Sequence, residues 1–147
     1  MLELVKAFLL SQGWQYSQPD TKNTFLFGLT LEKGKFQCYL QVDEEEFSLS
    51  FYSFIGVNCP ENKLIALSEL LNRINYEVFL GNFEMDFTDG EIRFKTNLSF
   101  ASITPSLPLI EELIFTNLNT IDKYYDSTLA VMFKEIDPSE AIKLVEI

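Results

Sequence analysis

Five stretches of the sequence alternate apolar and polar side chains, and this period of two constrains the fold more than any other feature. They run over residues 25–31, 36–42, 47–55, 83–87 and 92–98. Strict alternation is typical of a strand that buries one face. A slip of one residue would turn a whole apolar set outward, so the buried face of each strand is strongly specified. The pattern predicts an antiparallel sheet with one apolar face.

The last two stretches are separated by Asp89-Gly90, which favours a two-residue type I′ turn because both residues tolerate positive φ. Four cross-strand pairs follow from such a turn: Phe87–Ile92, Met85–Phe94, Asp86–Arg93 and Glu84–Lys95. The first two pairs are apolar and the last two join opposite charges, which stabilises neighbouring strands. We expect a tight hairpin with a polar outer face.

The first three stretches are joined at Lys33-Gly34 and at Glu44-Glu45. Two-residue turns at these points predict three further pairs: Leu31–Phe36, Leu29–Cys38 and Leu40–Leu49. The Lys-Gly turn could also close with a bulge.

Apolar spacings of three and four predict the helices. The first starts at Leu2 and ends at Gly13, a residue suited to the left-handed C′ position. The central helix carries one apolar stripe, formed by Leu64, Leu67, Leu71, Ile74 and Val78. Others are expected over residues 109–125, 128–133 and 138–145, the last with Asp137 as cap, Pro138 at its first position and Glu140 at its third. Residues 14–23, with Pro19-Asp20, are expected to form a loop.

These elements predict an α+β fold in which helices pack on one face of an antiparallel sheet. The expected order is αβββαββα plus a short C-terminal helix. No internal repeat or low-complexity linker is visible, so residues 1–147 are expected to form one domain.

The charge balance restricts the partners. With 22 acidic and 11 basic residues the net charge is −11, which disfavours binding to nucleic acid and to an anionic membrane surface. A basic or amphipathic polypeptide remains compatible with this charge. The N-terminus does not resemble a signal peptide, and no apolar stretch approaches the roughly 20 residues of a membrane span. We expect a soluble, cytoplasmic protein.

Catalytic and metal-binding patterns are weak. Histidine is absent, which removes the Ser-His-Asp and Cys-His pairs and most catalytic zinc sites. Cys38 lies on the apolar face of a predicted strand, so we expect a buried structural thiol. The acidic run Asp43–Glu46 could bind Ca²⁺, but a solubilising tip is the simpler interpretation. Arg93 and Lys95, opposite Asp86 and Glu84, should lower the pKa of both carboxyls and make them unsuitable as acids. We expect no enzyme activity, no cofactor and no metal site.

The outer face of the first three strands is the candidate site for protein contacts. Leu26, Tyr39, Tyr52 and Phe54 lie on it among small polar residues, with Tyr39 expected to face Gly28 and Ser50 and to lie diagonal to Tyr52. An aromatic face with few charges, in so acidic a chain, is where a partner or a second copy could pack. A terminal helix or a loop covering these rings is the alternative. The helix over residues 61–78 is a second possible location for a dimer contact.

The chain resembles the YbjN family of bacterial sensory-transduction regulators, within the type III secretion chaperone-like fold. The residues that carry the resemblance are 70–75 on the central helix, 81–86 and 89–95 in the second hairpin, 121–125, and 138–142. The resemblance implies an αβββαββα fold, no enzymatic site and a homodimer that binds other polypeptides. We therefore expect a non-enzymatic regulator or chaperone-like adaptor. The alternative is a sensor domain that holds a small apolar ligand between sheet and helices.

Overall fold

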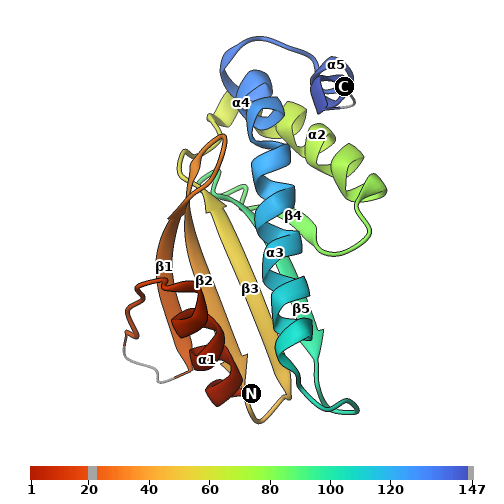
Figure 1. Ribbon diagram of the computed structural model, residues 1–147. Coiled ribbons are helices and arrows are strands. Elements are labelled where there is room, and N and C mark those ends of the chain that lie inside the picture. Colours follow the sequence, from red (N-terminus) through yellow and green to blue (C-terminus); the bar gives the residue numbers. More distant parts are fainter. Residues whose placement is uncertain (20–22, 146–147) are drawn as a thin grey trace.

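The computed structural model describes residues 1–19 and 23–145, which form a five-stranded antiparallel sheet with helices on one face (Figure 1). The strands are β1 (Thr24–Thr30), β2 (Lys35–Asp43), β3 (Ser48–Ile55), β4 (Asn82–Met85) and β5 (Ile92–Ser99). The α-helices are α1 (Leu2–Gln12), α2 (Leu64–Glu77), α3 (Leu107–Lys123), α4 (Tyr125–Phe133) and α5 (Pro138–Ala141). Short 3₁₀ turns, η1 (Glu61–Lys63) and η2 (Ile142–Val145), precede α2 and follow α5. The predicted α+β class and element order are confirmed.

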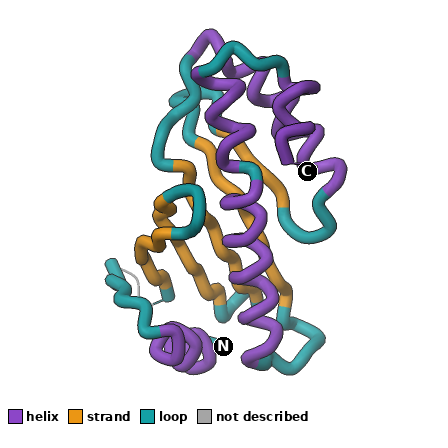
Figure 2. Tube along the Cα trace, turned by 45° about the horizontal axis from the view of Figure 1, so that its top comes forward, coloured by secondary structure: helices purple, strands orange, loops and turns teal. Residues whose placement is uncertain are grey.

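The strands follow the spatial order β1-β2-β3-β5-β4, so the second hairpin joins the first three strands through the β3–β5 pair. Figures 1 and 2 show α3 running along the inner face, α1 beside one end of it, and α2, α4 and α5 grouped at the other end. The core forms two clusters on this face, one under α1 and α3 and one under α2, α4 and α5. The opposite face of the sheet carries no helix among the described residues.

The predicted faces of the strands are correct, but the predicted pairings are wrong by two residues in all three hairpins. Leu29 pairs with Phe36 rather than Cys38, and Leu40 pairs with Phe51 rather than Leu49. In the second hairpin Met85 pairs with Ile92. Because side chains alternate with a period of two, a shift by two residues changes every partner and leaves each residue that stays in a strand on its expected face.

The hairpin loops are longer than two residues, and carboxylate side chains accept hydrogen bonds from their backbone N–H groups. In the first loop the backbone N–H of Lys33 donates to Asp122 Oδ1 at the end of α3 (2.9 Å). In the second, Asp43 Oδ1 accepts N–H groups from Glu45 and Glu46, and Phe47 takes a positive φ of 51° outside the strand.

The prediction of a type I′ turn at Asp89-Gly90 is also wrong. Residues 86–91 form the connection, closed by a bond from Gly90 N–H to the Asp86 carbonyl (2.7 Å). Gly90 has the expected positive φ, 80°, but its carbonyl accepts the Cys59 N–H (2.8 Å) from the segment before α2. Phe87, expected opposite Ile92, is 53% exposed in this loop. A tertiary contact therefore sets the geometry of this loop.

The helices agree with the pattern, with two differences. Gly13 ends α1 in the left-handed conformation, as predicted. The helix expected to run to residue 125 breaks at Tyr124, where α3 gives way to α4. Asp137 and Pro138 do start the last helix, but Asp137 makes no side-chain capping bond, and the helix continues as the 3₁₀ turn η2. Asp20 of the expected Pro19-Asp20 loop lies outside the described residues.

Candidate functional site

The face of the sheet that turns away from the helices, here called the outer sheet face, is built from alternate residues of all five strands. One row across it follows the register Leu26–Tyr39–Tyr52–Lys95–Asn82. The next row follows Gly28–Gln37–Phe54–Arg93–Glu84. Three of the four predicted site residues thus lie in one row, and Phe54 lies in the neighbouring row.

Tyr39 and Tyr52 are direct neighbours rather than diagonal ones, which corrects the predicted geometry. Their ring centroids lie 5.9 Å apart in an edge-to-face arrangement, and this geometry is favourable for aromatic pairs. The Arg93 guanidinium lies over the Tyr52 ring, 4.6 Å from its centroid, a cation–π contact. The rings are half-buried by these neighbours and still reach solvent. They form a preorganised aromatic patch in the middle of the sheet.

The outer sheet face is more charged than predicted, because β5 and β4 extend it. Glu84 accepts from both Arg93 (Oε2···Nε 2.6 Å) and Lys95 (Oε1···Nζ 2.5 Å). Partial burial acts to raise the pKa of Glu84, but hydrogen bonds from Lys95 and then Arg93 outweigh it, so the pKa is lowered. Glu84 is therefore ionised near neutral pH, as expected from its neighbours. The cluster largely neutralises itself, with one positive charge in excess.

The alternation pattern places five charged residues on this face: Lys35, Asp43, Glu84, Arg93 and Lys95. Three are basic and two acidic, whereas the whole chain has 11 basic and 22 acidic residues. The acidic excess therefore lies elsewhere on the molecule. A near-neutral face with paired rings and amide side chains can bind another polypeptide by stacking and hydrogen bonding.

The other carboxylates are held by local backbone groups. Asp86, expected opposite Arg93, lies in the 86–91 loop instead. The backbone N–H of Thr88 donates to its Oδ1 (2.8 Å) and is the main cause that lowers the pKa of Asp86. Among residues 1–19 and 23–145, no three His, Cys, Asp or Glu side chains cluster as metal ligands would. Cys38 is buried, as predicted, and this burial raises the pKa of its thiol to about 12.

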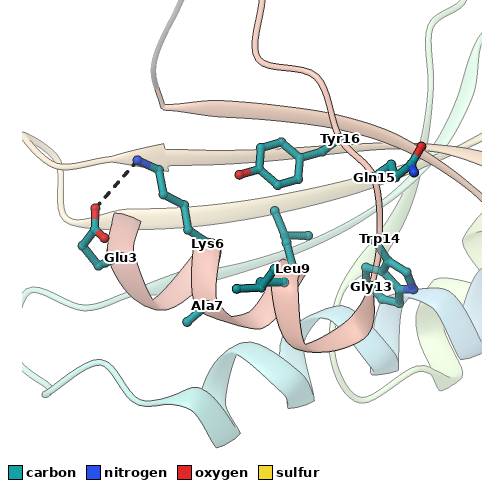
Figure 3. A pocket seen from close by; sticks show the side chains of 9 residues that line it. Glu3, Lys6, Ala7, Leu9, Gly13, Trp14, Gln15 and Tyr16 are labelled. Carbon is teal, nitrogen blue, oxygen red and sulfur yellow. Dashed lines mark ion pairs between the residues drawn. The ribbon is translucent and has the colours of Figure 1, made fainter.

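The phenylalanine-rich interior serves packing. Phe8, Phe25, Phe36, Phe51 and Phe94 have essentially no exposed surface. A hollow of about 510 Å³ lies outside the core, between α1 and residues 13–16 (Figure 3). Leu9, Trp14 and Tyr16 border it, and Lys6 at its edge pairs with Glu3 (3.7 Å). This hollow is not the pocket between sheet and helices that a sensor of apolar ligands was expected to have.

The helix over residues 61–78, named from the sequence as a second possible dimer contact, exposes apolar side chains on the side opposite its buried stripe. On the outward side of α2, Ile65 is 75% exposed and Tyr76 is 92% exposed, and Phe79 just beyond the helix is fully exposed. A signal for it exists in the sequence, because Ile65 and Tyr76 are about three helical turns apart on the side opposite the buried stripe.

Across the described part of the chain, no helix is long and apolar enough to cross a membrane.

Comparison with known proteins gives the following matches. A family model described as "YbjN: Putative bacterial sensory transduction regulator" matches residues 1–129. The crystal structure of YbjN from E. coli, described as a putative transcription regulator, aligns with a TM-score of 0.61 at 9% identity, covering 92% of this chain and 91% of that one. The crystal structure of the ExsC–ExsE complex aligns with a TM-score of 0.49 at 16% identity, covering 80% and 85%. A search among curated proteins finds no match.

Proposed function

The chain belongs to the YbjN family, and on this basis we propose that it is a non-enzymatic regulator or adaptor that acts as a homodimer through protein contacts. The outer sheet face is the proposed site where a partner polypeptide binds. The observation that carries the proposal is the row Leu26–Tyr39–Tyr52 on a sheet face without a helix. The family and its regulatory description support a role in regulation rather than catalysis.

The chemistry of the face restricts the partner. The net charge of −11 attracts basic polypeptides from a distance and repels acidic ones. Arg93 and Lys95 are already paired with Glu84, so the face itself offers mainly rings and amides, such as Gln37 and Gln41. A basic polypeptide with apolar side chains is attracted by the net charge and can pack on the rings and amides of the outer sheet face.

A non-enzymatic role agrees with the state of the carboxylates. Neighbouring donors lower the pKa of Glu84 and of Asp86, whereas a general acid at neutral pH needs a raised pKa. We also propose a cytoplasmic location. Cys38 and Cys59 are free thiols, which are typical of a reducing compartment.

The proposal is tested by measuring partner binding with two surface variants. Partners captured from a cell lysate are purified, and their affinity is measured by calorimetry for wild type and for the triple variant Tyr39→Ser/Tyr52→Ser/Phe54→Ser. We expect binding to weaken by at least about tenfold, the effect of losing a contact worth roughly 1.4 kcal/mol. The matched control, Ile65→Ser/Tyr76→Ser, removes apolar groups from α2 and should bind the partner with the wild-type affinity per chain.

A second variant keeps the test decisive if the triple variant does not fold. Gln37→Arg/Gln41→Arg changes two exposed positions of the outer sheet face and leaves the rings in place. It should repel a basic partner and block the same surface. If both variants stay folded by circular dichroism and bind like wild type, the sheet face is not the binding site.

A further inference from the structure

The hollow between α1 and residues 13–16 has the size and the lining of a small-molecule site. Its volume of about 510 Å³ falls within the roughly 300–1,000 Å³ that is usual for such sites. Ala7, Leu9, Leu10 and Trp14 give it mainly apolar walls, and Tyr16 lies across from the helix (Figure 3). Leu10 is 82% exposed and Tyr16 is 39% exposed, so a ligand that covers them removes apolar surface from water.

The walls of the hollow are held in place by contacts that need no ligand. The Trp14 ring stacks on Phe27 of β1, with the ring centroids 5.4 Å apart. Ser17 and Leu26 of β1 exchange two backbone hydrogen bonds of 2.9 Å each, and these bonds fix the segment that carries Tyr16. A ligand therefore enters a preformed site and does not have to order its walls on binding.

Small residues leave the space open along the helix. Ala7 borders the hollow with only a methyl group. Gly13, which ends α1 with a φ of 68°, has so much room beside it that an added Cβ would meet nothing within 4 Å. Lys6 and Gly13 are seven residues apart, or about 10 Å along a helix, which suits a straight alkyl chain of roughly eight to ten carbons.

One end of the hollow offers hydrogen-bond donors to an anion. The Lys6 ammonium lies 3.7 Å from the Glu3 carboxylate, which is longer than a charged hydrogen bond. The Glu3 side chain is 90% exposed, so it can turn to solvent when another anion takes its place. Figure 3 shows the Tyr16 hydroxyl on the side of its ring that faces Lys6, with Trp14 at the opposite end. A carboxylate accepts several hydrogen bonds and can bind both donors at once.

The charges select a ligand with one negative charge. The net charge of −11 opposes the approach of any anion, but this repulsion is screened beyond about 8 Å at physiological ionic strength. Of the described residues that line the hollow, Lys6 is the one basic residue and Glu3 the one acidic residue. A single carboxylate can therefore replace Glu3 beside Lys6, whereas a second negative charge on the ligand would have no cation to pair with.

We propose that the hollow beside α1 binds a straight-chain monocarboxylate of about eight to ten carbons. Its carboxylate accepts hydrogen bonds from Lys6 and Tyr16, and its alkyl chain lies along Ala7 and Leu10 towards Trp14. The site shares no residue with the row Leu26–Tyr39–Tyr52 of the outer sheet face. It therefore adds a small ligand to the protein contacts proposed above and does not depend on them.

The single tryptophan of the chain provides a local probe, because Trp14 borders the hollow. Decanoate, titrated below its micellar concentration, should change the Trp14 fluorescence saturably with a Kd in the micromolar range, and calorimetry should give the same Kd. Decanol has the same chain without the charge, and it should bind at least about tenfold more weakly because it loses the charged hydrogen bonds. Acetate, a carboxylate without the chain, should produce no saturable change.

Two variants separate the roles of the charge and of the space. Lys6→Gln should weaken decanoate binding by at least about tenfold and leave the weaker binding of decanol as in wild type. Lys35→Gln removes an exposed ammonium from β2 and is the matched control, which should bind decanoate like wild type. Ala7→Phe places a ring in the hollow and should abolish the binding of both ligands. Position 7 is exposed, so the larger side chain does not disturb the core, and circular dichroism checks the fold of each variant.

The proposal is overturned if decanoate produces no saturable change in wild type, or if its binding survives both Lys6→Gln and Ala7→Phe. Equal affinities for decanoate and decanol would show that no carboxylate is recognised and would also overturn it. If decanoate does not bind and Ala7→Phe instead weakens binding of the partner polypeptide, the hollow belongs to the polypeptide site. The variant Tyr39→Ser/Tyr52→Ser/Phe54→Ser should bind decanoate like wild type, so a failure of the proposed function and a failure of this site are distinguished.

Discussion

Ser53 on β3 donates its hydroxyl hydrogen to Asn117 Oδ1 on α3, over 2.5 Å, and both side chains are completely buried. The Asn117 amide in turn donates to the carbonyls of Phe51 (3.1 Å) and Phe94 (3.0 Å). One asparagine thereby fastens the long helix to two neighbouring strands in the middle of the core. Thr96 adds a bond from β5 to the Leu113 carbonyl of α3 (3.0 Å). This network fixes where α3 lies along the sheet.

Asn117→Ala should be strongly destabilising. It removes the acceptor of the Ser53 hydroxyl and leaves that group unpaired in the core, which costs about 1–3 kcal/mol, and the lost bonds to two carbonyls add to this. We expect the free energy of unfolding to fall by roughly 2–4 kcal/mol, measured by urea denaturation. Asn119→Ala, exposed two residues along the same helix, is the control and should change stability by less than about 0.5 kcal/mol. Equal stability of the two variants would mean that the network contributes little.

Gly90→Val should destabilise the fold, although the predicted type I′ turn does not form. Both the φ of Gly90 and its close contact with Cys59 oppose the larger side chain. The φ of Gly90 is 80°, which a β-branched residue adopts only with strain of about 1–3 kcal/mol. A Cβ at this position would also overlap the backbone of Cys59, so the segment before α2 must move. Thermal melts should show a clear loss for Gly90→Val and little change for Gly56→Ala, where an added Cβ meets open space. An unchanged melting temperature for Gly90→Val contradicts the packing of this loop against Cys59.

Stability should depend on the ionisation of Glu84. Its pKa is lowered in the folded state, so its contribution is fully present above the unfolded value of about 4.3 and is lost as the pH falls through the folded value. Glu84→Gln should therefore flatten the loss of stability on acidification below that pH. Urea unfolding at a series of pH values measures this. The protein concentration is kept low because a chain without net charge tends to precipitate, and the isoelectric point is near 4.3. The control Glu32→Gln removes an exposed loop carboxylate and should retain the wild-type pH profile.

Divalent metal should leave the protein unchanged. The acidic tip at Asp43–Glu46 already uses Asp43 Oδ1 to accept two backbone N–H groups, which leaves fewer oxygens for a cation that takes six to eight. Calorimetric titration with Ca²⁺ and with Mg²⁺ should give no binding tighter than about millimolar. A micromolar site that disappears in Asp43→Asn would refute this expectation and make a metal-dependent sensor worth testing.

The sequence determined which face each strand buries. Apolar alternation assigned Phe25, Cys38, Phe51 and Phe94 to the core, and all four are buried. It also assigned Leu26, Tyr39, Tyr52 and Phe54 to the opposite face, where the structure has them. The physical reason is that a period of two is a local property of an extended chain, and moving an apolar set into water is costly at every position of the strand.

Only the tertiary structure decided how the strands pair and what surrounds the outer tyrosines. The hydrophobic pattern is the same after a shift by two residues, so it could not choose between the predicted and the observed registers. Asp122 bonds the first loop, and Cys59 bonds the 86–91 loop, from distant parts of the chain. The β3–β5 pair brings Arg93 onto the Tyr52 ring. No local signal encodes these contacts, because they form only when separate segments pack on one core.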